Sequence, residues 1–128
     1  QRQMCIRDSL ISEIKFFFTE RIKAAKLAGI KDENIILDPG IGFGKTVEHN
    51  LILLQRLNEF SEFGFPLLIG TSRKSFIGKI SDVPTEQRVE GTIASNVLAV
   101  IKGAKIVRVH DVLEHRRAFD IVDAIEVA

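Results

Sequence analysis

The chain has little of the chemistry that marks secreted, membrane or nucleic-acid-binding proteins. Its single cysteine, Cys5, excludes an internal disulfide framework and permits a reducing, cytoplasmic setting. No apolar run approaches the length of a membrane span, and the first residues lack the apolar centre of a signal peptide. The 18 basic and 17 acidic residues nearly balance, and no basic run with interleaved aromatic residues occurs. We therefore expect no nucleic acid and no membrane as the main partner, which favours a small molecule.

The opening residues differ from everything that follows. Residues 1–8 do not share the later apolar periodicity, and position 1 is not methionine. We expect residues 1–8 to be a non-native leader, which reading the source DNA through the junction would test. Residues 9–128 contain no linker or low-complexity stretch and are expected to form one unit with a modest core.

Apolar periodicity predicts an alternating order of helices and strands, α-β-α-β-α-β-α. The expected strands are 35–37, 67–69 and 105–109. The expected helices are 9–28, a second beginning after Thr46, a short turn at 75–80 followed by 85–102, and a last one after Asp111. Such alternation implies a parallel sheet with right-handed crossovers. Three strands are too few to cover both faces of such a sheet, so this α/β chain is expected to be part of something larger.

Short capping signals predict where the helices begin and end. Gly29 is placed to end the first helix, Thr46 to cap the second and Thr85 to cap the fourth. Asp111 and Glu114 have the spacing of a capping box for the last helix. The faces expected to be buried are Leu51, Leu54, Leu57 and Phe60 in the second helix, and Ala118, Ile121, Val122 and Ile125 in the last.

The first strand runs into Asp38-Pro-Gly-Ile-Gly-Phe-Gly-Lys45. Asp38 can accept hydrogen bonds from a ring N–H and an exocyclic amine, or it can simply cap the loop beside Pro39. The glycines, Gly42 among them, permit a positive φ or the close approach of a ligand. Phe43 either meets a ligand or staples the loop to the core. The segment matches neither the Walker A nor the dinucleotide-binding pattern, because the first needs glycine at position 39, which is proline, and the second needs glycine at position 45, which is lysine.

The second strand is followed by Ser72-Arg73-Lys74-Ser75, just before a helix. Lys74 offers donors to ring oxygen or nitrogen atoms, and Ser75 can donate to a carboxylate. The alternative is a solvated basic turn.

The third strand carries Arg108 and His110 on the face of Ile106. Together these two side chains suit a phosphate or pyrophosphate, because arginine binds such oxygens in a bidentate way. The alternative is an internal salt bridge with Asp111 or Asp38. His49 lies on a helix and His115 near a charge-rich turn, and neither is expected to have a role.

The three segments Asp38-Pro-Gly-Ile-Gly-Phe-Gly-Lys45, Gly70-Thr-Ser-Arg-Lys-Ser75 and Arg108-Val-His-Asp-Val112 together resemble the carboxyl-terminal half of the dihydropteroate synthases. The resemblance runs from about Ser9 to the end of the chain. It implies a partial TIM (β/α)₈ barrel in which the present strands are the sixth, seventh and eighth. It also implies a folate-pathway reaction, in which 6-hydroxymethyl-7,8-dihydropterin pyrophosphate condenses with 4-aminobenzoate and pyrophosphate leaves.

Carried over by position, the resemblance implies a role for each strand end. Asp38 and Lys74 would hold the pterin, and Arg108 and His110 would bind the pyrophosphate, so that Lys74, Arg108 and His110 form the catalytic set. The residues implied around the aminobenzoate are Gly42, Phe43, Arg73 and Ser75. The magnesium ion of the family would have its ligand in the missing amino-terminal half, so this chain is expected to contribute no metal ligand. A cytoplasmic homodimer is implied for the whole enzyme.

Two other functions stay open. One is a sister pterin-binding barrel that transfers a methyl group from a methyl-folate to a corrinoid protein, which has no reason to keep the Ser-Arg-Lys-Ser turn or the Arg-Val-His pair. The other is a catalytically silent partial barrel, because the family's first two mobile loops and further pterin contacts are absent. The isolated chain is expected to be inactive and to fold poorly.

Overall fold

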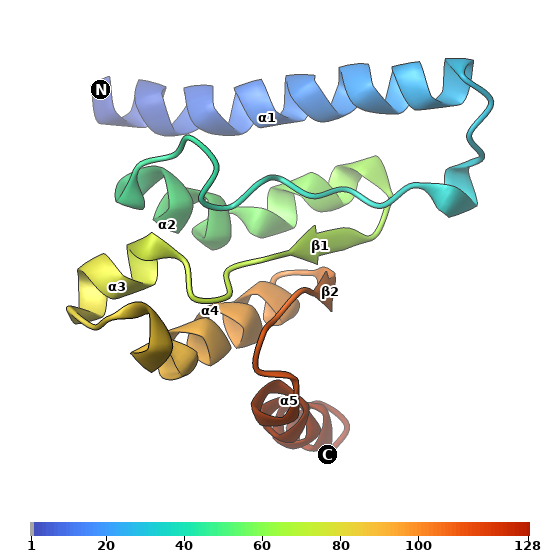
Figure 1. Ribbon diagram of the computed structural model, residues 1–128. Helices are drawn as coiled ribbons and strands as arrows, with labels where there is room; N and C mark the ends of the chain where they lie inside the picture. The colour runs from blue at the N-terminus through green and yellow to red at the C-terminus, as the bar shows by residue number, and fades with distance from the viewer. Residues whose placement is uncertain (1) are drawn as a thin grey trace.

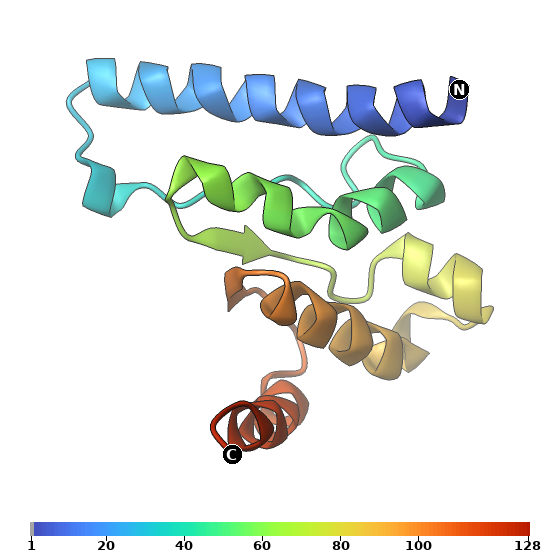
Figure 2. The same cartoon turned by 180° about the vertical axis from the view of Figure 1, so that it is seen from behind.

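The computed structural model describes the backbone of residues 2–128 and the side chains from Arg7 onward. The elements in chain order are α1 (Arg2–Leu27), η1 (Asp32–Asn34), α2 (Val47–Gln55), η2 (Leu57–Phe63), β1 (Leu67–Ile69), α3 (Ser75–Ser81), η3 (Thr85–Gln87), α4 (Val89–Ile101), β2 (Ala104–Val107) and α5 (Val112–Glu126). Figures 1 and 2 show α1 along one edge of the molecule and α5 at the opposite edge, with the two strands between them. None of the helices in the described range is long and apolar enough to cross a membrane.

The sheet consists of β1 and β2, which run parallel. Leu68 pairs with Ile106 and Ile69 pairs with Val107, after an irregularity in the register between Leu67 and Leu68. The parallel pairing confirms the sequence prediction, and it brings the carboxyl ends of both strands to the same edge of the sheet. Helix α4 lies between β1 and β2 along the chain and contacts β2.

The segment 35–37 is not a full strand, contrary to the sequence prediction. Within the described residues, it joins the sheet through a single parallel bridge between Leu37 and Leu67. The Leu37 amide donates to the Pro66 carbonyl at 2.9 Å, and the Leu68 amide donates to the Leu37 carbonyl at 2.8 Å. Pro39 follows closely and has no N–H to continue the ladder. The segment nevertheless lies beside β1 and runs in the same direction.

The helix boundaries follow the capping signals only in part. Helix α1 ends at Leu27 beside Gly29, whose φ is +91°, and the Thr46 side chain accepts a hydrogen bond from the His49 amide at 3.1 Å. Helix α1 also begins earlier than predicted, at Arg2. Residue 1 lies outside the described residues, and the foreign origin of residues 1–8 stays a prediction.

One predicted helix start and two predicted side-chain caps are wrong, whereas the last helix begins after Asp111 as predicted. Thr85 begins a short 3₁₀ turn and makes no capping hydrogen bond, and α4 starts only at Val89. At the last helix, Asp111 occupies the N-cap position but its side chain makes no cap hydrogen bond. Its carboxylate binds Arg73 instead, at 2.9 Å from Nη2. The Asp111 carboxylate binds this guanidinium from a distant loop and not the backbone N–H groups of its own helix, because hydrogen bonds between two ionised groups are stronger than those to a neutral amide.

The core lies between α1, the η2 turn and the buried face of the sheet. Phe18 of α1 packs edge-to-face on Phe60, with ring centroids 5.5 Å apart, and on Phe63 at 5.7 Å. Residues of α2, β1 and α3 complete the same cluster. Leu51 on α2 was expected in this core but is exposed, whereas Leu54 is buried.

Two apolar surfaces are open to solvent, which corrects the expected burial of the last helix. On α5, Ile121 is 63% exposed and Ile125 is 69% exposed. On the sheet, Ile106 is exposed, and Ile36 at its margin is 52% exposed. Alternation along the strands places these two isoleucines opposite the buried face. Nothing in the described part of the chain covers them.

Candidate functional site

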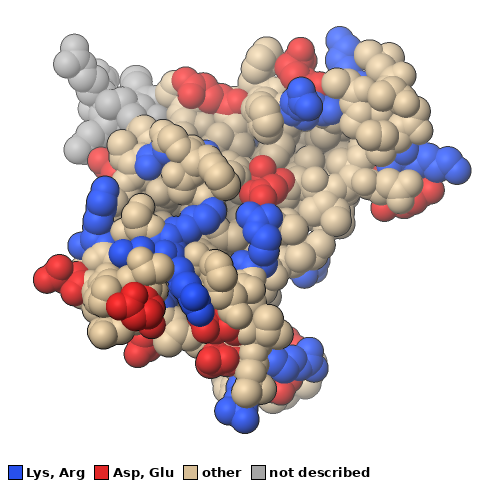
Figure 3. Space-filling model, in the orientation of Figure 1, with Lys and Arg blue, Asp and Glu red and all other residues tan. Residues whose placement is uncertain are grey.

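The candidate site lies at the edge where the three parallel segments end. Asp38 follows the bridge at Leu37, Gly70 follows β1 and Arg108 follows β2. The space-filling view in Figure 3 shows Lys and Arg side chains gathered on this side of the molecule. Ligand sites of parallel α/β folds form at the carboxyl ends of strands, so this edge is the natural place for one.

Asp38 and Arg108 meet across this edge. Nη1 of Arg108 lies 3.6 Å from Oδ2 of Asp38, while Oδ1 of Asp38 accepts a hydrogen bond from the Gly40 amide at 2.8 Å. Asp38 therefore both caps its loop and pairs with Arg108. Both contacts were among the alternatives predicted from the sequence. Gly70 makes room for the pair, because a Cβ there would come within 2.7 Å of the Arg108 guanidinium. Both charged side chains keep solvent-accessible surface and can still meet a ligand.

Lys74 crosses from the loop after β1 to the glycine-rich loop. Its ammonium donates to the Ile41 carbonyl and lies 4.7 Å from the centre of the Phe43 ring. Burial lowers the pKa of Lys74, as does the nearby Arg108 guanidinium, while Asp38 acts in the opposite direction. The side chain passes so close to Gly42 that a Cβ there would lie 2.9 Å from the Lys74 Cδ. Gly42 also has a φ of +91°, so both the contact and the backbone require glycine.

Phe43 does not staple the glycine-rich loop to the core. It is 69% exposed, with Lys74 above one ring face. The loop is held instead by polar groups that the sequence reasoning did not assign. Lys45 donates to the Gly40 carbonyl at 2.7 Å, and Asn50 accepts from the Gly42 amide at 2.8 Å. The sequence did contain a signal for Asn50, because a polar residue on the buried face of α2, beside Leu53, must find a hydrogen-bond partner.

Ser72 and His110 join the second and third strand ends. The Ser72 hydroxyl lies 2.7 Å from Nδ1 of His110, and it accepts a hydrogen bond from the His110 amide at 3.0 Å. Since the hydroxyl has a single proton, it can donate that proton to Nδ1 while accepting from the amide. The ring nitrogen Nε2 is then left for another partner.

A pocket of about 150 Å³ lies at these two ends. Its lining residues are Gly70, Ser72, Lys74, Arg108, Val109 and His110. Two of them carry a full positive charge, and His110 adds a ring N–H donor. An anion with several oxygens matches this lining, because each oxygen can accept from a different donor.

Arg73 and Ser75 lie on the other side of the turn. Ser75 opens α3 and is exposed, whereas the Arg73 guanidinium binds Asp111 through Nη2 at 2.9 Å and Nε at 3.4 Å. That contact holds the pKa of Asp111 below its usual range, mainly through the hydrogen bond to Arg73. The structure thus places all of the predicted site residues around one edge, with Arg73 tied to a carboxylate on its outer side.

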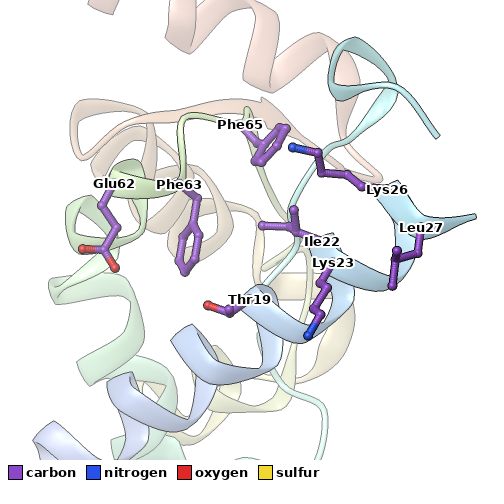
Figure 4. Close-up of a pocket in the computed structure, with 8 residues that line it drawn as sticks. All are labelled: Thr19, Ile22, Lys23, Lys26, Leu27, Glu62, Phe63 and Phe65. Atoms are coloured by element: carbon purple, nitrogen blue, oxygen red, sulfur yellow. The ribbon is translucent and has the colours of Figure 1, made fainter. Parts of the chain in front are cut away.

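A larger hollow of about 630 Å³ lies elsewhere, between the end of α1 and the η2 turn. Figure 4 shows Ile22, Phe63 and Phe65 around it. Phe65 lies two residues before β1, so this hollow is at the amino ends of the strands. Its two lysines, Lys23 and Lys26, both come from α1, and no residue from the carboxyl end of a strand lines it. It is not the candidate site. Among the residues whose side chains are described, no three His, Cys, Asp or Glu residues are arranged to hold a metal ion.

Comparison with known proteins identifies clear relatives. Residues 1–110 match the family model described as pterin binding enzyme. The chain is 52% identical over 118 residues to the dihydropteroate synthase of Clostridium beijerinckii, covering 91% of this chain and 44% of the relative. It is 46% identical over 117 residues to that of Escherichia coli K12, covering 91% of this chain and 42% of the relative. The chain therefore spans less than half the length of these relatives.

Solved structures agree with the sequence matches. The dihydropteroate synthase of Yersinia pestis superposes with a TM-score of 0.90 at 46% identity, covering 93% of this chain and 56% of that one. That of Xanthomonas albilineans, solved in complex with 7,8-dihydropteroate, superposes with a TM-score of 0.92 at 40% identity, covering 94% and 47%.

Proposed function

We propose, from the fact that this chain belongs to the pterin-binding enzyme family, that it is the carboxyl-terminal part of a dihydropteroate synthase. The whole enzyme would condense 6-hydroxymethyl-7,8-dihydropterin pyrophosphate with 4-aminobenzoate, giving 7,8-dihydropteroate and pyrophosphate. The observation that carries the proposal is the pocket in which Lys74, Arg108 and His110 meet beside the Asp38 carboxylate. A pyrophosphate leaving group needs such cations and N–H donors, and the amino edge of a pterin needs such a carboxylate.

The same proposal makes this chain one part of a (β/α)₈ barrel. The segment around Leu37, β1 and β2 would be its sixth, seventh and eighth strands. Two observations support this placement: the matched structures are longer than the chain, which covers 56% and 47% of them, and the sheet face that carries Ile106 is open. In a closed barrel this face would point inward and be covered by side chains from the other strands.

The chemistry would proceed without a nucleophile on the enzyme. Departure of pyrophosphate leaves a cation on the exocyclic methylene of the pterin, and the amine of 4-aminobenzoate then attacks it. Arg108 and His110 would hold the departing oxygens, which lowers the barrier because negative charge grows there in the transition state. When Arg108 turns to the anion, it frees Oδ2 of Asp38 for the pterin amine. Lys74 would hold the pterin oxygen and ring nitrogen, so that the reacting carbon stays in place.

The aminobenzoate would bind on the opposite side of the Lys74 side chain. The exposed Phe43 ring offers a flat surface for it, Gly42 allows close approach, and Ser75 at the start of α3 can donate to its carboxylate. Arg73 would shape this pocket, although its own guanidinium is bound to Asp111. These roles fit the family and the positions of the side chains together.

Three further parts of the proposal concern the whole enzyme. The magnesium ion of the family would have its ligand in the preceding half of the enzyme, and the chemistry proposed for these residues does not depend on it. A homodimer in the cytoplasm is what membership of the family implies. The isolated chain would be inactive, because its open apolar surfaces and missing strands leave the site incomplete.

A chimera tests the proposed function directly. Residues 9–128 would be joined behind the preceding residues of the Clostridium beijerinckii relative, and formation of 7,8-dihydropteroate would be measured. We expect product from this chimera and none from the isolated chain. The matched control carries Lys74→Ala. A folded chimera that binds no pyrophosphate and makes no more product than the control would refute the proposal, and product from the isolated chain would refute its inactivity.

A pH series gives a separate prediction on Lys74. Its ammonium has a lowered pKa in the free protein, so it loses its proton below its ordinary pKa of 10.5. A bound anion favours the charged form, so binding must take up a proton once Lys74 has deprotonated. The affinity of the chimera for pyrophosphate should therefore fall as the pH rises through this lowered pKa.

Calorimetric titration with inorganic pyrophosphate at several alkaline pH values measures this effect. The comparison is Lys74→Arg, because arginine keeps its charge across the whole range. The affinity for pyrophosphate should fall more steeply with rising pH in the original than in Lys74→Arg. Identical alkaline profiles would show that the charge of Lys74, which lines the same pocket, does not contribute to binding the anion.

A further inference from the structure

A chain of buried polar side chains lies behind the site and touches none of its pocket. The Thr71 hydroxyl donates to Oδ1 of Asn96 at 3.0 Å, and Nδ2 of Asn96 lies 3.0 Å from Nε2 of His115. Nδ1 of His115 lies 2.8 Å from the Asp111 carbonyl. Thr71 and Asn96 are fully buried, and His115 is 2% exposed, contrary to its expected place near a solvated turn. These residues come from the end of β1, from α4 and from α5.

The hydrogen-bond directions along this chain follow from one another. Because Oδ1 of Asn96 accepts from Thr71, its Nδ2 must donate to Nε2 of His115. His115 then carries its proton on Nδ1 and donates it to the Asp111 carbonyl. Asn96 and His115 each have a donor and an acceptor paired, and Thr71 donates to Asn96 while it accepts from the Ser95 hydroxyl at 2.8 Å. No buried side-chain polar atom in the described residues lacks a partner, so this arrangement is complete.

A second set of contacts closes the chain into a ring. The Asp111 carboxylate binds the Arg73 guanidinium, two residues after Thr71. Arg73 has a φ of +56°, in the left-handed region that is costly for a residue other than glycine. Its amide donates to the Thr92 hydroxyl at 3.1 Å, and its carbonyl accepts from Arg88 at 2.8 Å. The strained turn is thus held on its backbone and on its side chain.

Two residues of the pocket adjoin members of this ring. Ser72 lies between Thr71 and Arg73, and His110 immediately precedes Asp111. A shift of residues 71–73 relative to residues 110–111 would separate the Ser72 hydroxyl from Nδ1 of His110. The His110 ring would then be free to turn and to change tautomer, so Nε2 would no longer be the defined donor toward the pocket.

We propose that Asn96 and His115 are positioning residues, which hold residues 71–73 against residues 110–111 so that Ser72 orients His110 for an anion. The assignment of that anion as pyrophosphate rests on the proposed function, whereas the ring and its effect on His110 do not. A merely structural role would lower the unfolding temperature and leave the affinity of the folded protein unchanged. A positioning role changes the affinity and the His110 tautomer well below that temperature.

The sharpest variant is Thr71→Val in the chimera, since valine keeps the shape and loses the hydroxyl. We expect the dissociation constant of inorganic pyrophosphate to rise about tenfold or more, because a small displacement of a binding group is costly. Thr71→Ser keeps the hydroxyl and should restore most of the affinity. The matched control is Thr19→Val on α1, where the hydroxyl bonds only to the Lys15 carbonyl at an exposed position. This control should bind pyrophosphate like the original.

Two further measurements separate the possible failures. Long-range ¹⁵N–¹H spectra report which ring nitrogen of His110 is protonated, and this readout needs no ligand. We expect a single tautomer with Nε2 protonated in the original and a mixture in Thr71→Val. The milder variant His115→Gln keeps an acceptor for Asn96 and can be used if Thr71→Val does not fold. It should also give a mixture of His110 tautomers.

The outcomes distinguish the two proposals. If the unaltered chimera binds no pyrophosphate, the proposed function fails, and the His110 spectra alone then decide whether the ring orients that residue. If pyrophosphate binds equally well to the original, to Thr71→Val and to His115→Gln, and His110 keeps one tautomer in all three, Asn96 and His115 only stabilise the fold and the inference is wrong.

Discussion

Replacing Arg108 by glutamine should lower the kcat of dihydropteroate formation by the chimera by a factor of about 10²–10³, the usual cost of removing one preorganised donor to a developing anion. Glutamine keeps a polar side chain of similar reach but has neither the charge nor the paired N–H groups of a guanidinium. Arg108 lines the pocket with Lys74 and His110, and no other guanidinium in the described residues lines it. Steady-state kinetics with the pterin pyrophosphate as the varied substrate would measure the loss.

The control for this experiment is Arg116→Gln. Arg116 lies on the solvent side of α5, where its Nε is 3.3 Å from Asp120, one turn further along the same helix. An exposed pair of this kind contributes little to stability, so the control should retain the original kcat. If both variants lost activity equally, the effect would reflect overall charge, and Arg108 would have no special role at the leaving group.

Replacing Phe18 by alanine should have the largest effect on stability, a loss of about 3–5 kcal/mol in the free energy of unfolding. Phe18 is buried between the edges of Phe60 and Phe63, and it joins α1 to the rest of the core. Its removal leaves a cavity and takes away two aromatic contacts at once. The shift of the urea unfolding midpoint of the chimera would measure the loss.

Phe17→Ala is the matched control, because Phe17 is the preceding residue of the same helix and is 54% exposed. It makes the same chemical change and the same change in helix propensity, so any difference between the two variants comes from burial. We expect the control to change the midpoint only slightly. Similar losses in both variants would mean that α1 packs on the core through a different face.

Local signals in the sequence predicted the parts of the fold that depend on neighbouring residues. Thr46 caps α2, and Gly29 follows α1 with a positive φ, because these interactions are made within a few residues of chain. The strand at 67–69 was predicted in full, since an apolar run between Pro66 and Gly70 permits little else. The same reasoning placed the polar groups of the candidate site at the three strand ends.

The predictions failed where a distant partner competed with a local one. Asp111 had the spacing to cap its own helix, yet it binds Arg73, 38 residues earlier in the chain. His115 was expected near a solvated turn, yet Asn96, 19 residues away, accounts for its burial by supplying a donor to Nε2. The apolar residues of α5 have the right periodicity for burial, but a helix face is buried only if another element lies against it.

The sequence by itself determined the alternating order of helices and parallel segments, except that 35–37 forms a single bridge and no full strand, and it determined the chemical groups at the ends of these segments. Periodicity, caps and turns are short-range properties of the chain. Only the tertiary structure decided how those groups act on each other. The pairing of Asp38 with Arg108, the hydrogen bond from Ser72 to His110 and the buried ring behind them each join segments that are far apart in sequence. Such contacts depend on strand register and helix docking, where a shift of one residue would turn every side chain to the opposite face.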